Sequence, residues 1–231
     1  MSKYTARGLR SLAARKGGRS GINGSVIGVT LLTATSGTFT PNAATRAMYI
    51  RMTGAGGAGG GAGNTVTTGG GGGCAGGFAE MYLTNILPSY AYACGAAVNG
   101  GAGAGGNGGL TSFGTFSVPG GQGGAVGSAS AAPRVAAGGA GSGDPANPIH
   151  DWATGSFSGM PGKNYTTTLA MGGAGGCNPL GMGGGARSTD GVGIAATGRG
   201  GGGGGARSVA AGTARNGGNS TGGAIHIVEL K

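Results

Sequence analysis

Acidic residues and histidines are scarce in this sequence of 231 residues, which contains five Asp and Glu and two His. General acid–base catalysis and metal binding draw mainly on these side chains. The two histidines, His150 and His226, lie far apart and have no Ser or Cys partner at a spacing typical of a catalytic site. The composition therefore argues against an enzyme, and we expect neither a cofactor nor a metal site.

Large apolar side chains are also scarce. Leu, Ile, Val and Phe make up about 14 per cent of the chain, below the roughly 20 per cent at which an ordinary hydrophobic core becomes doubtful. Glycine is abundant instead, with 64 residues. Because glycine destabilises a helix by about 1 kcal/mol per site relative to alanine, this composition disfavours helix bundles and doubly wound α/β folds.

Low apolar content is typical of disorder, but disordered chains usually carry many charges, and only 9 per cent of these residues are charged. Glycine can instead adopt the polyproline II conformation, with three residues per turn, a rise of about 3.1 Å per residue and no internal hydrogen bonds. The N–H and C=O groups of such polyglycine II segments must bond to neighbouring segments. Where glycine faces inward, several segments can pack side by side.

The glycine spacing supports this interpretation. Glycines recur at every third position in five blocks: Gly54, Gly57, Gly60 and Gly63; Gly70, Gly73 and Gly76; Gly100, Gly103, Gly106 and Gly109; Gly121, Gly124 and Gly127; Gly198, Gly201 and Gly204. A collagen triple helix is the main rival, but eight Pro and short glycine blocks cannot sustain its continuous repeat. A flexible linker is the other alternative, and it fits the many separate glycine blocks badly.

Four segments have the apolar, β-branched or alternating character of strands. They are residues 25–33, 46–53, 78–84 and 224–230. In the second of them, Met48, Ile50 and Met52 face one side and the intervening residues the other. We expect one small antiparallel sheet at the base of a polyglycine II bundle with exposed loops, in a mainly β, partly irregular fold. Tyr90 and Tyr92 are expected to be buried against this sheet.

Residues 1–24 form a separate basic arm, and residues 25–231 form the glycine-rich domain. The arm has no acid and contains six of the fifteen basic residues: Lys3, Arg7, Arg10, Arg15, Lys16 and Arg19. Such an arm can neutralise nucleic-acid phosphates without sequence specificity, or thread into an acidic groove of a protein partner and order there. Anchoring to a protein is the favoured alternative. A short helix is expected around Leu9–Lys16, and no apolar run resembles a secretory signal.

The longest segment between glycine blocks, 144–171, contains the only Trp, three of the eight Pro and two of the five acids. A loop of this length in a compact body is usually functional or disordered. Its candidate receptor-contact residues are His150, Asp151, Trp152, Phe157 and Tyr165. The aromatic rings offer large flat surfaces to sugars or protein pockets, and His150 and Asp151 offer polar contacts. Alternatively, Trp152 fills a gap in a body that is poor in side chains.

Three cysteines, Cys74, Cys94 and Cys177, contain no CxxC pair, so no zinc site is indicated. We expect simple buried thiols, with one disulfide as the alternative. The glycine runs contain strings like GxGxxG, but none leads from a strand into a helix with the Lys-Ser/Thr of a phosphate loop. Nucleotide binding is therefore not expected.

The order of strands and glycine runs resembles the glycine-rich domains at the ends of bacteriophage tail fibres and in phage adhesins. The motifs that carry the resemblance are GTFTPNAATRAMYIRMTGAGGAGGG (37–61), GGGGGCAGGFAEMYLT (69–84), GGAGAGGNGGLTSFG (100–114) and GGAIHIVEL (222–230). The resemblance covers residues 36–231. It implies a small β base, a bundle of polyglycine II segments, and exposed loops at the bundle ends that contact molecules on the host-cell surface.

The basic arm and the short chain depart from these domains, which often end much longer fibres. With these departures, the resemblance implies a structural protein of a phage virion, a capsid spike or tail-fibre tip, assembled in the host cytoplasm. We expect its arm to bind other virion proteins, the protein to form homo-oligomers on the particle, and its loops to bind a host receptor. The alternative is a capsid assembly or minor capsid protein whose arm contacts the packaged genome. A eukaryotic glycine-rich cell-wall or silk-like protein is the least favoured alternative.

Overall fold

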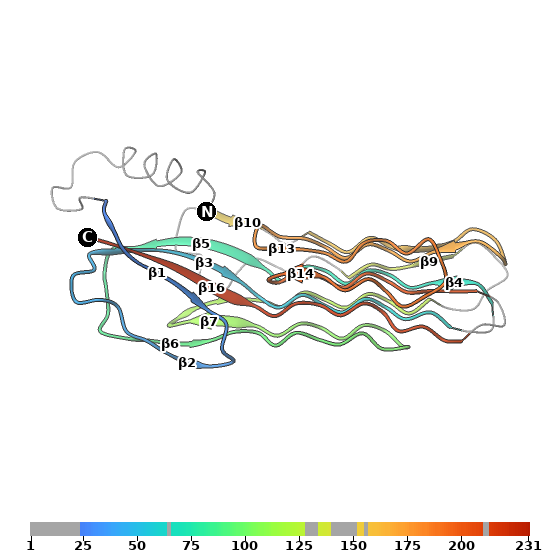
Figure 1. Ribbon diagram of the computed structural model, residues 1–231, viewed down its shortest axis with the longest axis horizontal. Coiled ribbons are helices and arrows are strands. Elements are labelled where there is room, and N and C mark those ends of the chain that lie inside the picture. The colour runs from blue at the N-terminus through green and yellow to red at the C-terminus, as the bar shows by residue number, and fades with distance from the viewer. Residues whose placement is uncertain (1–23, 64–65, 128–133, 140–151, 155–156, 210–212) are drawn as a thin grey trace.

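The computed structural model describes residues 24–63, 66–127, 134–139, 152–154, 157–209 and 213–231. The body is elongated, with sheets at one end and long runs of chain along the remaining length (Figure 1). We call the sheet end the base and the remainder the glycine bundle. All regular elements in the described ranges are strands, which confirms the mainly β, partly irregular fold. The expected helix around Leu9–Lys16 lies outside these ranges.

The base contains a five-stranded antiparallel sheet in the order β1-β16-β3-β5-β10. Its strands are β1 (Val26–Leu32), β3 (Ala47–Thr53), β5 (Phe78–Leu83), β10 (Trp152–Thr154) and β16 (Ala224–Leu230). The prediction that the four apolar segments share one sheet is confirmed. The fifth strand, β10, comes from the segment that the sequence indicated as the longest loop.

The alternation predicted for β3 gives this sheet a fully buried inner face. Met48, Ile50 and Met52 are all 0% exposed. Register places Ile227 of β16 on one side of Ile50 and Met81 of β5 on the other. Since side chains alternate between faces with a period of two, the apolar residues of three strands meet on one face and form the core of the base.

A second, four-stranded antiparallel sheet supplies the other half of this core, in the order β2-β6-β7-β8. Its strands are β2 (Gly37–Phe39), β6 (Tyr90–Ala93), β7 (Thr111–Phe113) and β8 (Phe116–Val118). Phe113 is fully buried and stacks on Tyr90, with ring centroids 4.7 Å apart. The expected burial of Tyr90 is confirmed, and Tyr92 is partly buried against the same core. A φ of 57° at Gly114 permits the tight turn between β7 and β8.

The glycine bundle is held together by hydrogen bonds between the backbones of separate segments. Segment 54–62 continues β3 and is buried throughout. Each of its N–H groups donates to a neighbouring segment at N···O distances of 2.8–3.0 Å, and every third N–H donates to the same neighbour. The series that begins at Gly54 donates to segment 71–77. The series that begins at Ala55 donates to segment 103–109, and the series that begins at Gly56 donates to segment 215–221. This threefold rotation is the predicted polyglycine II arrangement.

Segment 70–77 repeats the arrangement. Gly70, Gly73 and Gly76 all donate to segment 200–206, as their spacing predicts. The residues between them donate alternately to segments 119–125 and 157–160. These bonds join segments of one chain.

The other predicted glycine registers have different outcomes. Gly121, Gly124 and Gly127 all donate to segment 54–62, so this register is confirmed. Gly103, Gly106 and Gly109 supply the carbonyls that accept from segment 54–62. Gly201 and Gly204 share segment 218–221, whose N–H groups donate to both their carbonyls, whereas Gly198 belongs to the short strand β14 and departs from this register. Gly203 and Ala206 donate to segment 54–62.

Short strands pair within the glycine bundle. β4 (Thr68–Gly69) pairs with β15 (Arg207–Ser208), and β13 (Gly181–Met182) pairs with β14 (Thr197–Gly198). β9 (Arg134–Ala136), β11 (Gly162–Asn164) and β12 (Ala170–Met171) form a three-stranded sheet in the order β12-β11-β9. These strands join neighbouring segments mostly at the end of the bundle far from the base, where β4 and β9 lie (Figure 1).

The thiols are not all placed as expected. Cys74 and Cys94 are buried, as predicted, whereas Cys177 is exposed, and no disulfide joins the three. Cys177 follows the bundle segment 172–176 where the chain turns back, with Asn178 and Gly181 bonded to each other. The prediction of a buried thiol is therefore wrong for Cys177, because its side chain lies at a turn on the bundle surface.

Interior glycines should resist substitution, and surface glycines should tolerate it. A Cβ at Gly60 would overlap the carbonyl oxygen of Ala125, whereas a Cβ at Gly101 would meet nothing within 4 Å. We expect Gly60→Ala to lower the free energy of unfolding by about 3 kcal/mol, because backbone must move to make room. Gly101→Ala should change it by less than about 0.5 kcal/mol. Denaturant unfolding measures both, and equal losses in the two variants would contradict the close packing described above.

Candidate functional site

The attachment point of the basic arm and the last residue of the chain lie together at the base. Lys231 donates its N–H to the carbonyl of Ser25 at 3.0 Å. The arm continues through Gly24 into β1, and β16 runs from the glycine bundle outward to Leu230. We call this extremity the base end. It is the end opposite the bundle turns (Figure 1).

The other extremity, which we call the distal end, consists of turns between bundle segments. The described part of the distal end includes the turn Tyr165–Leu169, residues 187–191, Arg207 and Arg215. Asn164 precedes the turn, and its side-chain oxygen accepts the N–H of Gly69 at 2.8 Å, which fastens the turn to β4. The distal end is thus fixed to the bundle by backbone and side-chain bonds.

The structure spreads the described receptor-contact candidates along the body. Trp152 begins β10 and pairs with Glu80 in the base. Phe157 lies along the bundle, 67% exposed, with its carbonyl accepting the N–H of Ala75 at 3.2 Å. Tyr165 lies at the distal end, roughly 35 Å from Trp152 if each residue of the neighbouring segment advances about 3.1 Å. These residues therefore do not form one contact surface.

The remaining candidates lie outside the described residues. They are His150 and Asp151 of the receptor-contact set and the arm residues Lys3, Arg7, Arg10, Arg15, Lys16 and Arg19. Their roles stay predictions from the sequence. Of the receptor-contact set, the described part of the chain places only Tyr165 on the distal end.

The turn Tyr165–Leu169 presents two large side chains on a bonded backbone. The N–H groups of Tyr165 and Thr166 both donate to the carbonyl of Leu169, at 2.8 and 3.1 Å. The Thr166 hydroxyl oxygen accepts the N–H groups of Thr168 and Leu169 at 3.2 and 2.9 Å. The side chains of Tyr165 and Leu169 are 43% and 51% exposed. The turn thus holds an aromatic ring and an apolar side chain ready for contact with a partner.

Three arginines that the sequence analysis did not single out also occupy the distal end. Arg215 forms an ion pair with Asp190, with Nη2 2.5 Å from Oδ2. Arg207 donates from Nη1 to the carbonyl of Ser188. The hydrogen bond from Arg215 lowers the pKa of Asp190, and the charge of Arg207 adds to this effect. Arg187 lies with its guanidinium against Gly191, the residue that follows Asp190.

A repeated motif could have indicated two of these arginines. GGGARS occurs at 183–188 and again at 203–208, and in both places a glycine run ends in Ala-Arg-Ser. Because the two runs lie side by side in the bundle, bonded between Gly184 and Gly202, their arginines leave it at the same end. The repeat marks the end of a glycine segment, but the sequence does not show which segments are neighbours.

The base end exposes an uncharged edge strand. β1 is last in the strand order, so alternate N–H and C=O groups point away from β16 without a strand partner in the described part of the chain. Val26, Val29 and Leu31 are 47%, 62% and 56% exposed. Proteins usually protect such an edge with charges, proline or a covering loop. This edge has the features that accept an added strand.

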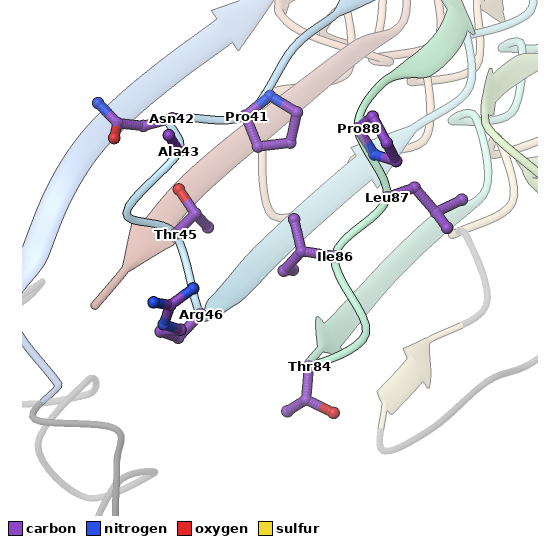
Figure 2. Close-up of a pocket in the computed structure, with 9 residues that line it drawn as sticks. All are labelled: Pro41, Asn42, Ala43, Thr45, Arg46, Thr84, Ile86, Leu87 and Pro88. Carbon is purple, nitrogen blue, oxygen red and sulfur yellow. The ribbon is translucent and has the colours of Figure 1, made fainter.

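A pocket of about 360 Å³ also opens at the base end. It lies between the turn 41–46 and the loop 84–88, with Ile86 facing the turn across it (Figure 2). Arg46 lines it, and its N–H donates to the carbonyl of Leu230 at 2.8 Å, so the pocket adjoins the end of β16. None of the described receptor-contact candidates, Trp152, Phe157 and Tyr165, is among the residues that line this pocket.

No family model matches the chain, and no curated protein matches it significantly. Within the described ranges, no three His, Cys, Asp or Glu side chains are grouped as metal ligands. The same ranges contain no helix long and apolar enough to cross a membrane. The arrangement of the two ends is therefore what bears on function.

Acid should destabilise the five-stranded sheet through His226. Burial is the main cause that lowers the pKa of His226 from its usual 6.5, and the positive charge of Arg51 beside it lowers this pKa further. The unfolded chain then binds a proton more readily than the folded chain, so stability falls as pH drops below about 6.5. We expect the Tm to fall less between about pH 7.5 and about pH 5.5 in His226→Gln than in the wild type. Calorimetry measures this, and the same fall in both proteins would contradict the assignment.

Proposed function

We propose that this protein is a structural protein of a bacteriophage particle, a capsid spike or tail-fibre tip, that binds a receptor on the host cell. It is held at its base end and directs its distal end outward. The observation that carries the proposal is the separation of the two ends by the glycine bundle. The arm attachment and an uncharged edge strand lie at one extremity, and the exposed turn Tyr165–Leu169 lies at the other.

The glycine bundle suits such a role physically. Each residue of segment 54–62 is tied to a neighbour by its backbone, so the body is cross-linked along its length. A body held this way can carry loops at its end without a large apolar core. The resemblance of the strand and glycine motifs to phage fibre and adhesin domains points in the same direction. Nothing in this role requires a catalytic residue, a cofactor or a metal.

The base end supplies two means of attachment to other virion proteins. The six cations of the arm provide charge, and β1, which directly follows the arm, provides an open strand edge. The added strand is expected to come from a different virion protein, because antiparallel pairing of β1 with a second β1 would point the two bodies in opposite directions. Copies on one particle must point the same way, so homo-oligomers would form through other surfaces.

The alternative is a minor capsid or assembly protein whose arm contacts the packaged genome. The observation that favours it is the segregation of six basic residues into an arm without acids. Deletion of residues 1–20 separates the two functions. Loss of the protein from the particle supports anchoring, whereas a particle that keeps the protein but retains less nucleic acid supports the alternative.

Purified protein should bind cells of the bacterium that the particle infects. Substitution of both Tyr165 and Leu169 by Ala should weaken this binding about tenfold, because both side chains are exposed in a fixed turn. Leu87→Ala, at an equally exposed apolar residue of the base end, is the matched control and should have no effect. Cell binding measured with labelled protein tests this, with Trp152→Ala in parallel. Absence of binding by the wild type contradicts attachment, and a loss confined to Trp152→Ala contradicts contact through the distal end.

A charge on β1 should detach the protein from the particle. Val29→Lys places an ammonium group on the open edge, where a partner strand would otherwise pack, and should reduce the copies per particle several-fold. Since Val29 is 62% exposed, the stability of the isolated protein should change by less than about 0.5 kcal/mol. Leu110→Lys, at a 54% exposed residue away from β1, is the control. Quantification of the protein in purified particles gives the result, and full incorporation of Val29→Lys would contradict docking on β1.

A further inference from the structure

We infer that the distal end contains a binding site for an oxyanion, the carboxylate or phosphate group of an acidic surface polymer, formed by Arg187, Arg207 and Arg215. The site deepens the proposed function and rests on it only for the source of the anion. The reasons are the convergence of three guanidinium groups from separate segments, their excess over acidic groups, and the incomplete hydrogen bonding of two of them.

The backbone of each arginine is fixed by a reciprocal pair of hydrogen bonds to another segment. The pairs join Arg187 to Gly172 (2.9 and 3.2 Å), Arg207 to Gly191 (2.9 and 3.1 Å) and Arg215 to Ala62 (2.9 and 3.0 Å). Long side chains normally lose much conformational entropy on binding. Here the bundle sets the backbone positions, and the side chains of Arg207 and Arg215 are also held, by the carbonyl of Ser188 and by Asp190, which lowers that loss.

Two of the guanidinium groups act on one carboxylate, and the third lies against the residue that follows it. Asp190 pairs with Arg215 through both its oxygens, Nη2–Oδ2 at 2.5 Å and Nε–Oδ1 at 3.4 Å. Arg207 acts on the same carboxylate through its charge, and the guanidinium of Arg187 lies against the adjacent Gly191. Among the described residues, Asp190 is thus the one acidic group shown in contact with this cluster of three arginines. Arg215 has its own partner, and Arg187 and Arg207 carry the excess.

Two guanidinium donors lack a partner. The Nε atoms of Arg187 and Arg207 are buried and make no hydrogen bond within the described part of the chain. A buried donor without a partner is unfavourable, and a guanidinium that has lost water at one edge gains more from an approaching anion. Both side chains are only partly buried, so their outer nitrogens can receive a carboxylate or phosphate in the two-bond geometry that arginine favours.

Arg51, Glu229 and Lys163 do not have these features. Arg51 is paired with Glu80 at 2.9 Å, and Glu229 accepts bonds from Asn42 and Thr45 at 2.7 Å. Lys163, on β11, is exposed, and its neighbours in the sheet are Val135 and Met171. Lys163 is therefore a suitable control, because it has the same charge as the arginines without their convergence.

Binding of small anions to the full chain tests the site. The probes are inorganic phosphate and glucuronate, titrated at constant ionic strength against sodium chloride and followed by NMR at the arginine Nε–H groups and at Gly191. We expect saturable shifts at Arg187 and Arg207. Arg207→Gln should weaken the binding about tenfold, and Arg207→Lys should weaken it as well, because it keeps the charge but loses the planar fork. Lys163→Gln should weaken it less than about twofold.

Each outcome bears on the inference. The site is overturned if Lys163→Gln and Arg207→Gln weaken anion binding equally, or if no shift saturates. The anion would then respond only to the overall positive charge of the protein. Arg207→Lys provides the test if Arg207→Gln does not fold. Tighter binding of phosphate indicates a phosphate-bearing polymer, and tighter binding of glucuronate a uronic-acid polymer. Anion binding without cell attachment would contradict the proposed function but support the anion site. Cell attachment without anion binding would contradict the anion site but support the proposed function.

Discussion

The hydrogen bond between the backbones of neighbouring polyglycine II segments is the interaction on which the rest of this structure depends. A typical bond is the one from the N–H of Gly57 to the carbonyl of Cys74, at 2.9 Å. One such bond contributes only about 1 kcal/mol net, but every residue of a central segment makes one. The backbones approach so closely that a Cβ at Gly57 would overlap the carbonyl of Gln122. Glycine is therefore a structural requirement of the interior, and backbone contacts replace most of the side-chain packing of an ordinary domain.

The base sheet determines which glycine segments become neighbours. Register pairs Thr53 of β3 with Phe78 of β5 and with Ala224 of β16. The glycine runs that continue from these three strands then start side by side, and the first N–H beyond β3, at Gly54, donates to Gly77 just before β5, at 2.9 Å. The apolar pairs of the sheet thus fix the register of a bundle that has few side chains to fix it. This explains how a small core, gathered at one end, organises a much longer body.

The same arrangement concentrates chemically distinctive side chains at the extremities. Inside the bundle only glycine and small residues fit, whereas turns at its ends are free of that constraint. The exposed ring of Tyr165 and the arginines at the distal end, and the uncharged edge of β1 at the base end, follow from this division. A body of this kind separates two binding surfaces by its length, which is the physical basis of the attachment role proposed above.

Much of the fold could be predicted from local patterns. Alternation identified four strands of the main sheet, and threefold spacing identified glycine segments such as the one beginning at Gly54. The second sheet escaped prediction because its strands have three or four residues, too few for a clear alternation. The sequence indicates one loop over 144–171, but parts of this segment pair with β5 and run along the bundle. Its aromatic residues suggested contact, and nothing in the sequence showed that they are spread along the body.

Local patterns in the sequence account for the building elements of this protein: strands with apolar alternation, glycine segments that bond in three directions, and a separate basic arm. Which segments bond to one another follows only from the three-dimensional packing. A polyglycine II segment has no internal hydrogen bonds, so all its bonding partners lie in other segments. The threefold glycine spacing shows that a segment needs such neighbours, but it does not show which segments they are. For the same reason the convergence of Arg187, Arg207 and Arg215 near residues 188–191 depends on how the segments pack, and no local pattern contains it.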